Sequence, residues 1–156
     1  MKMSIHIRQA KVEDAELVGN AVTDLIHELF PEVATKYPRN EMLDSATKLL
    51  RDAPGVWAFI AADDDGNTAG VLTLNECAAI SVGGNFGEIY ELIVSPEYRS
   101  AGVGWKLIEA AAEFGRARGW PLLEVGAPDV PRWQRTVDFY LKNGFTEIGP
   151  RLELKI

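Results

Sequence analysis

The sequence contains a single cysteine, Cys77, among its 156 residues. One cysteine cannot form an internal disulfide or supply the paired thiolates of a zinc knuckle, so we expect a protein of a reducing compartment, the cytoplasm. Histidine is equally scarce. His6 and His27 are far apart and lack the spacing of metal ligands, so we expect no metal site.

Long apolar runs and an excess of positive charge are also missing. No stretch approaches the roughly 18 apolar residues that a membrane-spanning helix needs. Lysine and arginine number 16 against 23 aspartates and glutamates, which gives a formal net charge of -7. An acidic chain repels the nucleic acid backbone. We therefore expect neither a membrane nor a nucleic acid as a partner, and an acidic body favours a cationic small molecule.

The chain has the size and composition of one α/β domain, residues 1–156. It is 47% hydrophobic, which is enough for one buried core. Alternating or continuous apolar runs predict strands at residues 4–8, 56–62, 69–80, 86–94 and 121–125, and a broken strand pair at residues 145–156. Helical spacing of apolar residues predicts helices at residues 12–30, about 42–53, 103–119 and 131–144. The strands at 56–94 should form an antiparallel meander.

The stretch "RSAGVG", Arg99 to Gly104, joins the strand at 86–94 to the helix that follows it. Backbone amides at a helix start bind anions, and glycines let a phosphate approach the backbone closely. The turn is therefore either a phosphate-binding nest, with Arg99 as an added cation, or only a tight connection. The Walker spacing is absent. The dinucleotide fingerprint has Leu107 where its third glycine belongs.

Three segments together resemble a known family. "IYELIVSPEYRSAGVGWKLIEAAAEFGRARG" resembles the acetyl-coenzyme A motif of the GNAT N-acetyltransferases, "FYLKNGF" resembles that family's late helix, and "IHIRQAKVEDAELV" is similar to its opening strand and helix. The resemblance covers nearly the whole chain in the right order. It implies a mixed, mostly antiparallel sheet of six to seven strands with about four helices.

The resemblance also implies acetyl-CoA as the acyl donor and a set of residues that bind it. The turn would hold the pyrophosphate, and a strand edge would bind the pantetheine arm by strand addition. The expected cofactor-binding residues are Leu92, Ile93, Val94, Arg99, Ser100, Ala101, Gly102, Val103 and Gly104. The backbone N–H of Ile93 or Val94 would polarise the thioester carbonyl.

Acetyl transfer to an amine needs a proton acceptor and a proton donor. Tyr140, which matches the family's general acid, is the expected donor, and core packing is the alternative for it. Glu91, or else Glu88, is the expected base. Three residues apart, these two point to opposite faces of a regular strand, so only one should reach the site unless a bulge intervenes.

Some positions depart from the family's pattern or leave alternatives open. Trp133 stands where the family often has asparagine, and Trp105 would either cover part of the cofactor or face a neighbouring subunit in a homodimer. The acceptor, a small-molecule or peptide amine, is expected near Phe30, Tyr37 and Trp133. The alternative function is a non-catalytic acyl-CoA-binding sensor or regulatory subunit with the same fold.

Overall fold

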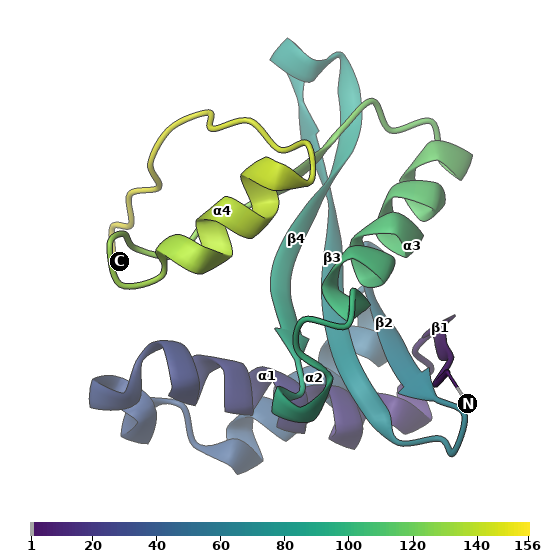
Figure 1. Cartoon of the computed structure of the whole chain (residues 1–156). Helices are drawn as coiled ribbons and strands as arrows, with labels where there is room; N and C mark the ends of the chain where they lie inside the picture. The colour runs from purple at the N-terminus through teal and green to yellow at the C-terminus, as the bar shows by residue number, and fades with distance from the viewer. Residues whose placement is uncertain (1) are drawn as a thin grey trace. The chain divides into compact units, whose positions relative to one another are not determined.

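The computed structural model describes residues 2–156. They group into two compact units, which are divided in the sequence between Glu124 and Val125. Each unit is described by itself. The first unit contains, in chain order (Figure 1), β1 (Ile5–Gln9), α1 (Ala15–Leu29), α2 (Arg39–Asp52), β2 (Val56–Asp63), β3 (Thr68–Ala79), β4 (Gly84–Val94) and α3 (Val103–Ala117). The short strand β5 (Leu123–Val125) crosses the junction, and α4 (Gln134–Lys142) belongs to the second unit.

The described strands form one sheet in the order β1-β2-β3-β4-β5. The first four pair antiparallel with their neighbours. The predicted meander is therefore confirmed. β3 is the central strand of the sheet, and its Leu72 and Leu74 are fully buried.

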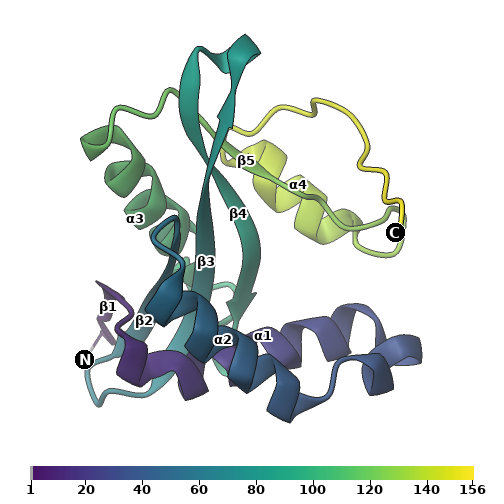
Figure 2. The same ribbon diagram turned by 180° about the vertical axis from the view of Figure 1, so that it is seen from behind.

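Helices cover both faces of the sheet in the first unit. Figure 2 shows α1 and α2 side by side, and Val18 of α1 packs in a core cluster with Ala58, Ile60 and Val71. The opposite face carries α3. There, a Cβ added to Gly70 would lie 3.1 Å from Leu107 of α3. Successive side chains of β3 point to opposite faces of the sheet, so Val71 lies on the face that α1 covers and Gly70 on the face that α3 covers.

Two expectations about the carboxyl-terminal part were wrong. The described residues form five strands instead of six to seven, since residues 145–156 form no strand. The apolar side chains of Leu152, Leu154 and Ile156 are 96%, 86% and 118% exposed. Their alternation matches a strand, but a strand forms only where a neighbour pairs with its backbone. The last helix begins at Gln134, not at Pro131, because a turn precedes it, in which the Gln134 N–H donates to the Pro131 carbonyl over 3.2 Å.

Candidate active site

A bulge in β4 places Glu88 and Glu91 on the same face of the sheet. Glu91 lies opposite Thr73 and Glu88 opposite Asn75, and the register shifts by one residue at Tyr90. Thr73 and Asn75 are two residues apart on a regular strand and therefore share a face, so their two partners share it as well. This is the face that α1 covers, since Ile93, two residues after Glu91, packs against the cluster around Val18.

Both carboxylates are shielded from water in different surroundings. Glu88 is only 6% exposed, and the Cys77 thiol donates to its Oε2 over 3.7 Å. The Glu91 backbone N–H donates to the Thr73 hydroxyl over 3.0 Å. Burial raises the pKa of the Glu91 carboxyl, and a hydrogen bond with Thr73 opposes part of that rise. A carboxylate with a raised pKa is a stronger base, which suits the acceptance of a proton.

The last residues of β4 direct alternate backbone groups away from β3. The Ser95 N–H donates to the Ala69 carbonyl over 2.9 Å, and the register is regular from there back to Glu91. In an antiparallel pair of strands, the N–H and carbonyl groups of successive residues point alternately toward the partner strand and away from it. Those of Ile93 therefore point toward β3, and those of Leu92 and Val94 point away from it. Of the three residues expected to bind pantetheine, Leu92 and Val94 thus direct their backbone groups to the side of β4 away from β3, where the Val94 carbonyl accepts a hydrogen bond from Arg99.

The glycine turn has the backbone of an anion-binding nest. Ser100 and Gly102 have φ angles of +67° and +80°, and α3 begins at Val103. The first amides of a helix have no carbonyl partner within it. Gly102 provides the left-handed conformation, whereas Gly104 is helical and buried within the first turn of α3. A turn with this backbone, placed at the start of a helix, is of the kind that binds anions.

The Arg99 guanidinium, expected as an added cation at the turn, is paired in the structure. It donates to both carboxylate oxygens of Glu28 on α1, over 2.9 and 2.7 Å, and to the Val94 carbonyl over 3.0 Å. The Glu28 and Arg99 side chains are 38% and 42% exposed. A phosphate that reaches Arg99 must therefore compete with the Glu28 carboxylate.

We expect Glu28→Gln to tighten the binding of CoA. The substitution removes the competing negative charge while keeping the side chain's length. An exposed ion pair is worth at most about 1 kcal/mol, so the dissociation constant should fall by up to about fivefold. Titration calorimetry with CoA measures this. Asp24→Asn is the matched control, because Asp24 lies on the same helix and pairs with Arg39 instead. An unchanged or raised dissociation constant would show that Arg99 does not meet the phosphates.

Tyr140 lies in α4 of the second unit and is buried there, with 8% of its surface exposed. Its ring packs against Phe139 and Phe145, with centroid distances of 5.4 and 5.3 Å. Burial raises the pKa of its phenol to about 12. The hydroxyl therefore keeps its proton across the whole physiological pH range, as a proton donor must.

The region expected to receive the acceptor lies at the end of α1. Phe30 and Tyr37 flank a short 3-10 helix, Pro31–Lys36, and are 37% and 40% exposed. The Tyr37 carbonyl lies 2.9 Å from the His27 ring nitrogen Nε2, which holds this segment against α1. These two half-exposed aromatic rings can contact the apolar part of an amine.

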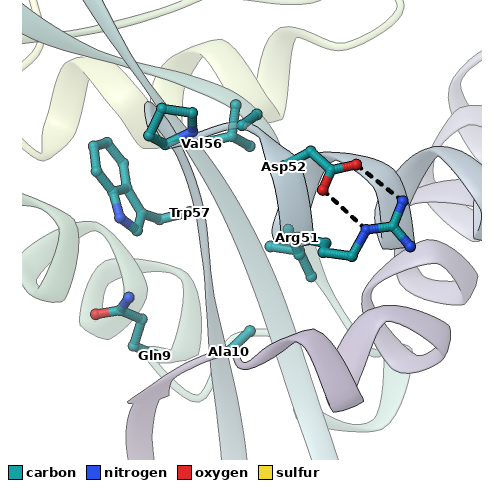
Figure 3. A pocket seen from close by; sticks show the side chains of 9 residues that line it. Gln9, Ala10, Arg51, Asp52, Val56 and Trp57 are labelled. Carbon is teal, nitrogen blue, oxygen red and sulfur yellow. Dashed lines mark hydrogen bonds and ion pairs between the residues drawn. The ribbon is translucent and has the colours of Figure 1, made fainter.

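A separate pocket of about 290 Å³ opens at the end of α2. Figure 3 shows Trp57 beside it and the ion pair between Arg51 and Asp52 on its rim. The lining comes from the ends of β1 and α2 and the start of β2, and it shares no residue with the sites described above. Within residues 2–156, no three His, Cys, Asp or Glu side chains are grouped so that they could hold a metal ion.

Comparison with known proteins identifies the family. The family model described as "Acetyltransferase (GNAT) family" matches residues 19–145. The chain belongs to this family and is an N-acetyltransferase. It is 31% identical over 137 residues to an "IAA acetyltransferase" of Azospirillum brasilense, which covers 84% of this chain and 80% of that protein. No helix in the described part of the chain is long and apolar enough to cross a membrane.

Solved structures share the fold. A ribosomal-protein-alanine N-acetyltransferase from Brucella melitensis superposes with a TM-score of 0.74 at 20% identity, covering 98% of this chain and 100% of that one. An aminoglycoside N-acetyltransferase in complex with CoA superposes with a TM-score of 0.76 at 19% identity, covering 100% and 97%. The predicted fold class is therefore confirmed, apart from the number of strands.

Sequence reasoning missed three residues around the glycine turn. Glu28, on α1, was not connected with Arg99, from which it is separated by 71 positions. Tyr98 precedes the turn directly, and Asp63 lies at the end of β2, where the β2–β3 hairpin turns. The Tyr98 hydroxyl donates to Asp63 over 2.7 Å. The acidic run "DDDGN" signals the turn but not this contact.

Proposed function

We propose that this enzyme transfers the acetyl group of acetyl-CoA directly to a primary amine of a small molecule or peptide. The observation that carries the proposal is the arrangement along β4. Two shielded carboxylates share one face of the strand, and the same strand ends in the nest of the glycine turn. A base and an anion-binding turn on one rigid element are what this reaction requires.

Each residue then has a defined part. The amides of the turn bind the pyrophosphate, and the outward N–H of Val94 and carbonyl of Leu92 bind the pantetheine arm, since the Val94 carbonyl already accepts from Arg99. Glu91 accepts the proton of the acceptor ammonium, directly or through water, with Glu88 as the alternative base. The freed amine forms its bond to the thioester carbon, and the carbon–sulfur bond breaks.

Two further groups stabilise this transfer. The Leu92 N–H, which faces away from β3 and lies farther from the turn than Val94, donates a hydrogen bond to the thioester oxygen as negative charge develops on it. Of the two donors that the resemblance implied, Ile93 is directed toward β3, and Val94 lies beside the pyrophosphate end of the arm. Tyr140 donates its phenolic proton to the departing thiolate, and the second proton that the new amide nitrogen must lose restores the phenol through water. The assignment of Tyr140 to this site rests on the family's "FYLKNGF" pattern, and the family match at residues 19–145 supports a single domain that includes both compact units.

The test is the release of free CoA thiol from acetyl-CoA over a panel of amines. The panel should include aminoglycosides and peptide amino termini, because solved structures of similar fold are named for such acceptors. We expect thiol release that depends on one class of amine, and a rise in melting temperature with acetyl-CoA, since a ligand of the native state stabilises it by mass action. A thermal shift without thiol release for any amine would favour the non-catalytic sensor. No shift at millimolar acetyl-CoA would contradict the proposal.

A further inference from the structure

A buried hydrogen bond connects the β2–β3 hairpin with the residue in front of the glycine turn. Asp63, the last residue of β2, is 8% exposed, and its carboxylate accepts four hydrogen bonds. Three come from within the hairpin: the backbone N–H groups of Asp65 and Asn67 over 3.0 and 2.8 Å, and the Asn67 side chain over 3.0 Å. The fourth and shortest is that of the Tyr98 hydroxyl, at 2.7 Å.

Tyr98 connects this carboxylate to the backbone of the turn. It is 9% exposed and ends the short 3-10 helix Pro96–Tyr98, directly before Arg99. Its N–H donates to the Ser95 carbonyl over 2.9 Å, and its own carbonyl accepts from the Ala101 N–H over 3.3 Å. A residue fixed at its side chain thus holds one end of the turn through its main chain.

The glycine turn needs such support because its backbone is strained. Ser100 has a φ angle of +67°, which is unfavourable for a residue with a Cβ atom. A strained conformation persists only where the surrounding structure enforces it. Amides that bind an anion must also be oriented before the anion arrives, since ordering them on binding would cost affinity.

We propose that Asp63 and Tyr98 are positioning residues for the donor substrate, because their hydrogen bond fixes the backbone of Arg99–Gly104 in its anion-binding conformation. The inference rests on the proposed function, in which this turn binds the pyrophosphate of CoA. Neither side chain touches the ligand in this scheme. The three hairpin bonds of Asp63 close the β2–β3 turn without Tyr98, so the fourth bond is the one that acts on the glycine turn.

Tyr98→Phe tests this, since it removes the hydroxyl and keeps the ring. The dissociation constant for CoA, measured by titration calorimetry well below the melting temperature, should rise about tenfold, the scale of one hydrogen bond to a charged group. The KM for acetyl-CoA should rise by a similar factor, while kcat and the KM for the amine stay within about twofold because only donor binding is affected. A role in stability alone would leave both donor constants unchanged in the folded variant.

Asn67→Ala is the matched control, because it removes a hydrogen bond to the same Asp63 carboxylate from the hairpin side. It should leave the dissociation constant for CoA unchanged. If Asn67→Ala weakens CoA binding as much as Tyr98→Phe, or if Tyr98→Phe leaves CoA binding unchanged, the positioning role is overturned.

A measurement without ligand separates this proposal from the proposed function. In the free protein, Tyr98→Phe should speed amide hydrogen exchange at residues 99–104, while exchange in α1 stays as in the unsubstituted protein. Faster exchange at the turn in a protein that binds no CoA would uphold the positioning of the turn and contradict only its ligand. Unchanged exchange at the turn would overturn the positioning role itself.

Discussion

Tyr140→Phe is expected to lower kcat by about 100- to 10,000-fold, the usual contribution of a general acid, and to leave the dissociation constant for CoA unchanged. Phenylalanine keeps the ring that packs against Phe139 and Phe145, so α4 should remain folded. Only the proton for the departing thiolate is lost. Thiol-release kinetics and calorimetry with CoA on the same preparation measure the two quantities.

The pKa of Tyr140 adds a second measurement to this prediction. A tyrosine with the ordinary pKa of 10.0 is half deprotonated at that pH, whereas burial raises the pKa of Tyr140 to about 12. The acid form is the active one, and it is lost only as the pH rises through the raised value. The kcat of the unsubstituted protein should therefore not fall as the pH is raised to about 10, where an ordinary tyrosine has lost half its protons. A kcat of Tyr140→Phe within about twofold of the unsubstituted protein, far below the range given for general acids, would leave Tyr140 as a core aromatic residue.

Gly104→Glu is expected to abolish the binding of CoA. Gly104 lies buried in the first turn of α3, so the new side chain must project into the nest or displace its backbone. Its negative charge also opposes an anion at a helix start, where the dipole favours negative charge from the ligand instead. The thermal shift with acetyl-CoA should disappear, and calorimetry should detect no heat of CoA binding.

The control for this prediction is Ala117→Glu, which adds the same charge at the exposed last turn of the same helix. It should bind CoA with an unchanged dissociation constant. Circular dichroism establishes that both variants are folded, and Gly104→Ala provides a smaller step, with one added methyl group. A folded Gly104→Glu protein that binds CoA normally would place the pyrophosphate elsewhere.

The sequence predicted helices and strands well where apolar residues recurred regularly over a long segment and a glycine or proline marked its end. The helix α3 ends where the run to Gly119 indicated, and Gly119 has a φ angle of +77°, typical of a residue that follows a helix. The pattern failed at residues 145–156, because alternation describes which side chains share a face but not whether a partner strand is there. Pairing depends on distant residues, which a local pattern does not contain.

In the candidate site, too, the local features could be predicted from the sequence and the contacts between distant residues could not. The turn at Arg99–Gly104 is contiguous in the sequence, so its nest could be predicted from its glycines. The ion pair of Arg99 with Glu28 and the hydrogen bond of Tyr98 with Asp63 join positions 71 and 35 residues apart. Contacts of this kind follow from the packing of α1 and of the β2–β3 hairpin, and no spacing rule predicts them.

The bulge at Tyr90 allows two carboxylates that are three residues apart in the sequence to share one face of β4. If the same residues paired in regular register, with Tyr90 opposite Leu74, then Ile89, which is 1% exposed, would lie opposite Asn75, and Glu88 would lie opposite Glu76. A carboxylate would then enter the layer under α3, and an isoleucine would replace it beside Asn75. Deleting Tyr90 would remove the bulge and leave Glu88 and Glu91 two positions apart on a regular strand, and therefore still on one face. Natural variants of this segment that keep both carboxylates should therefore either retain the bulge or lose one residue together with it.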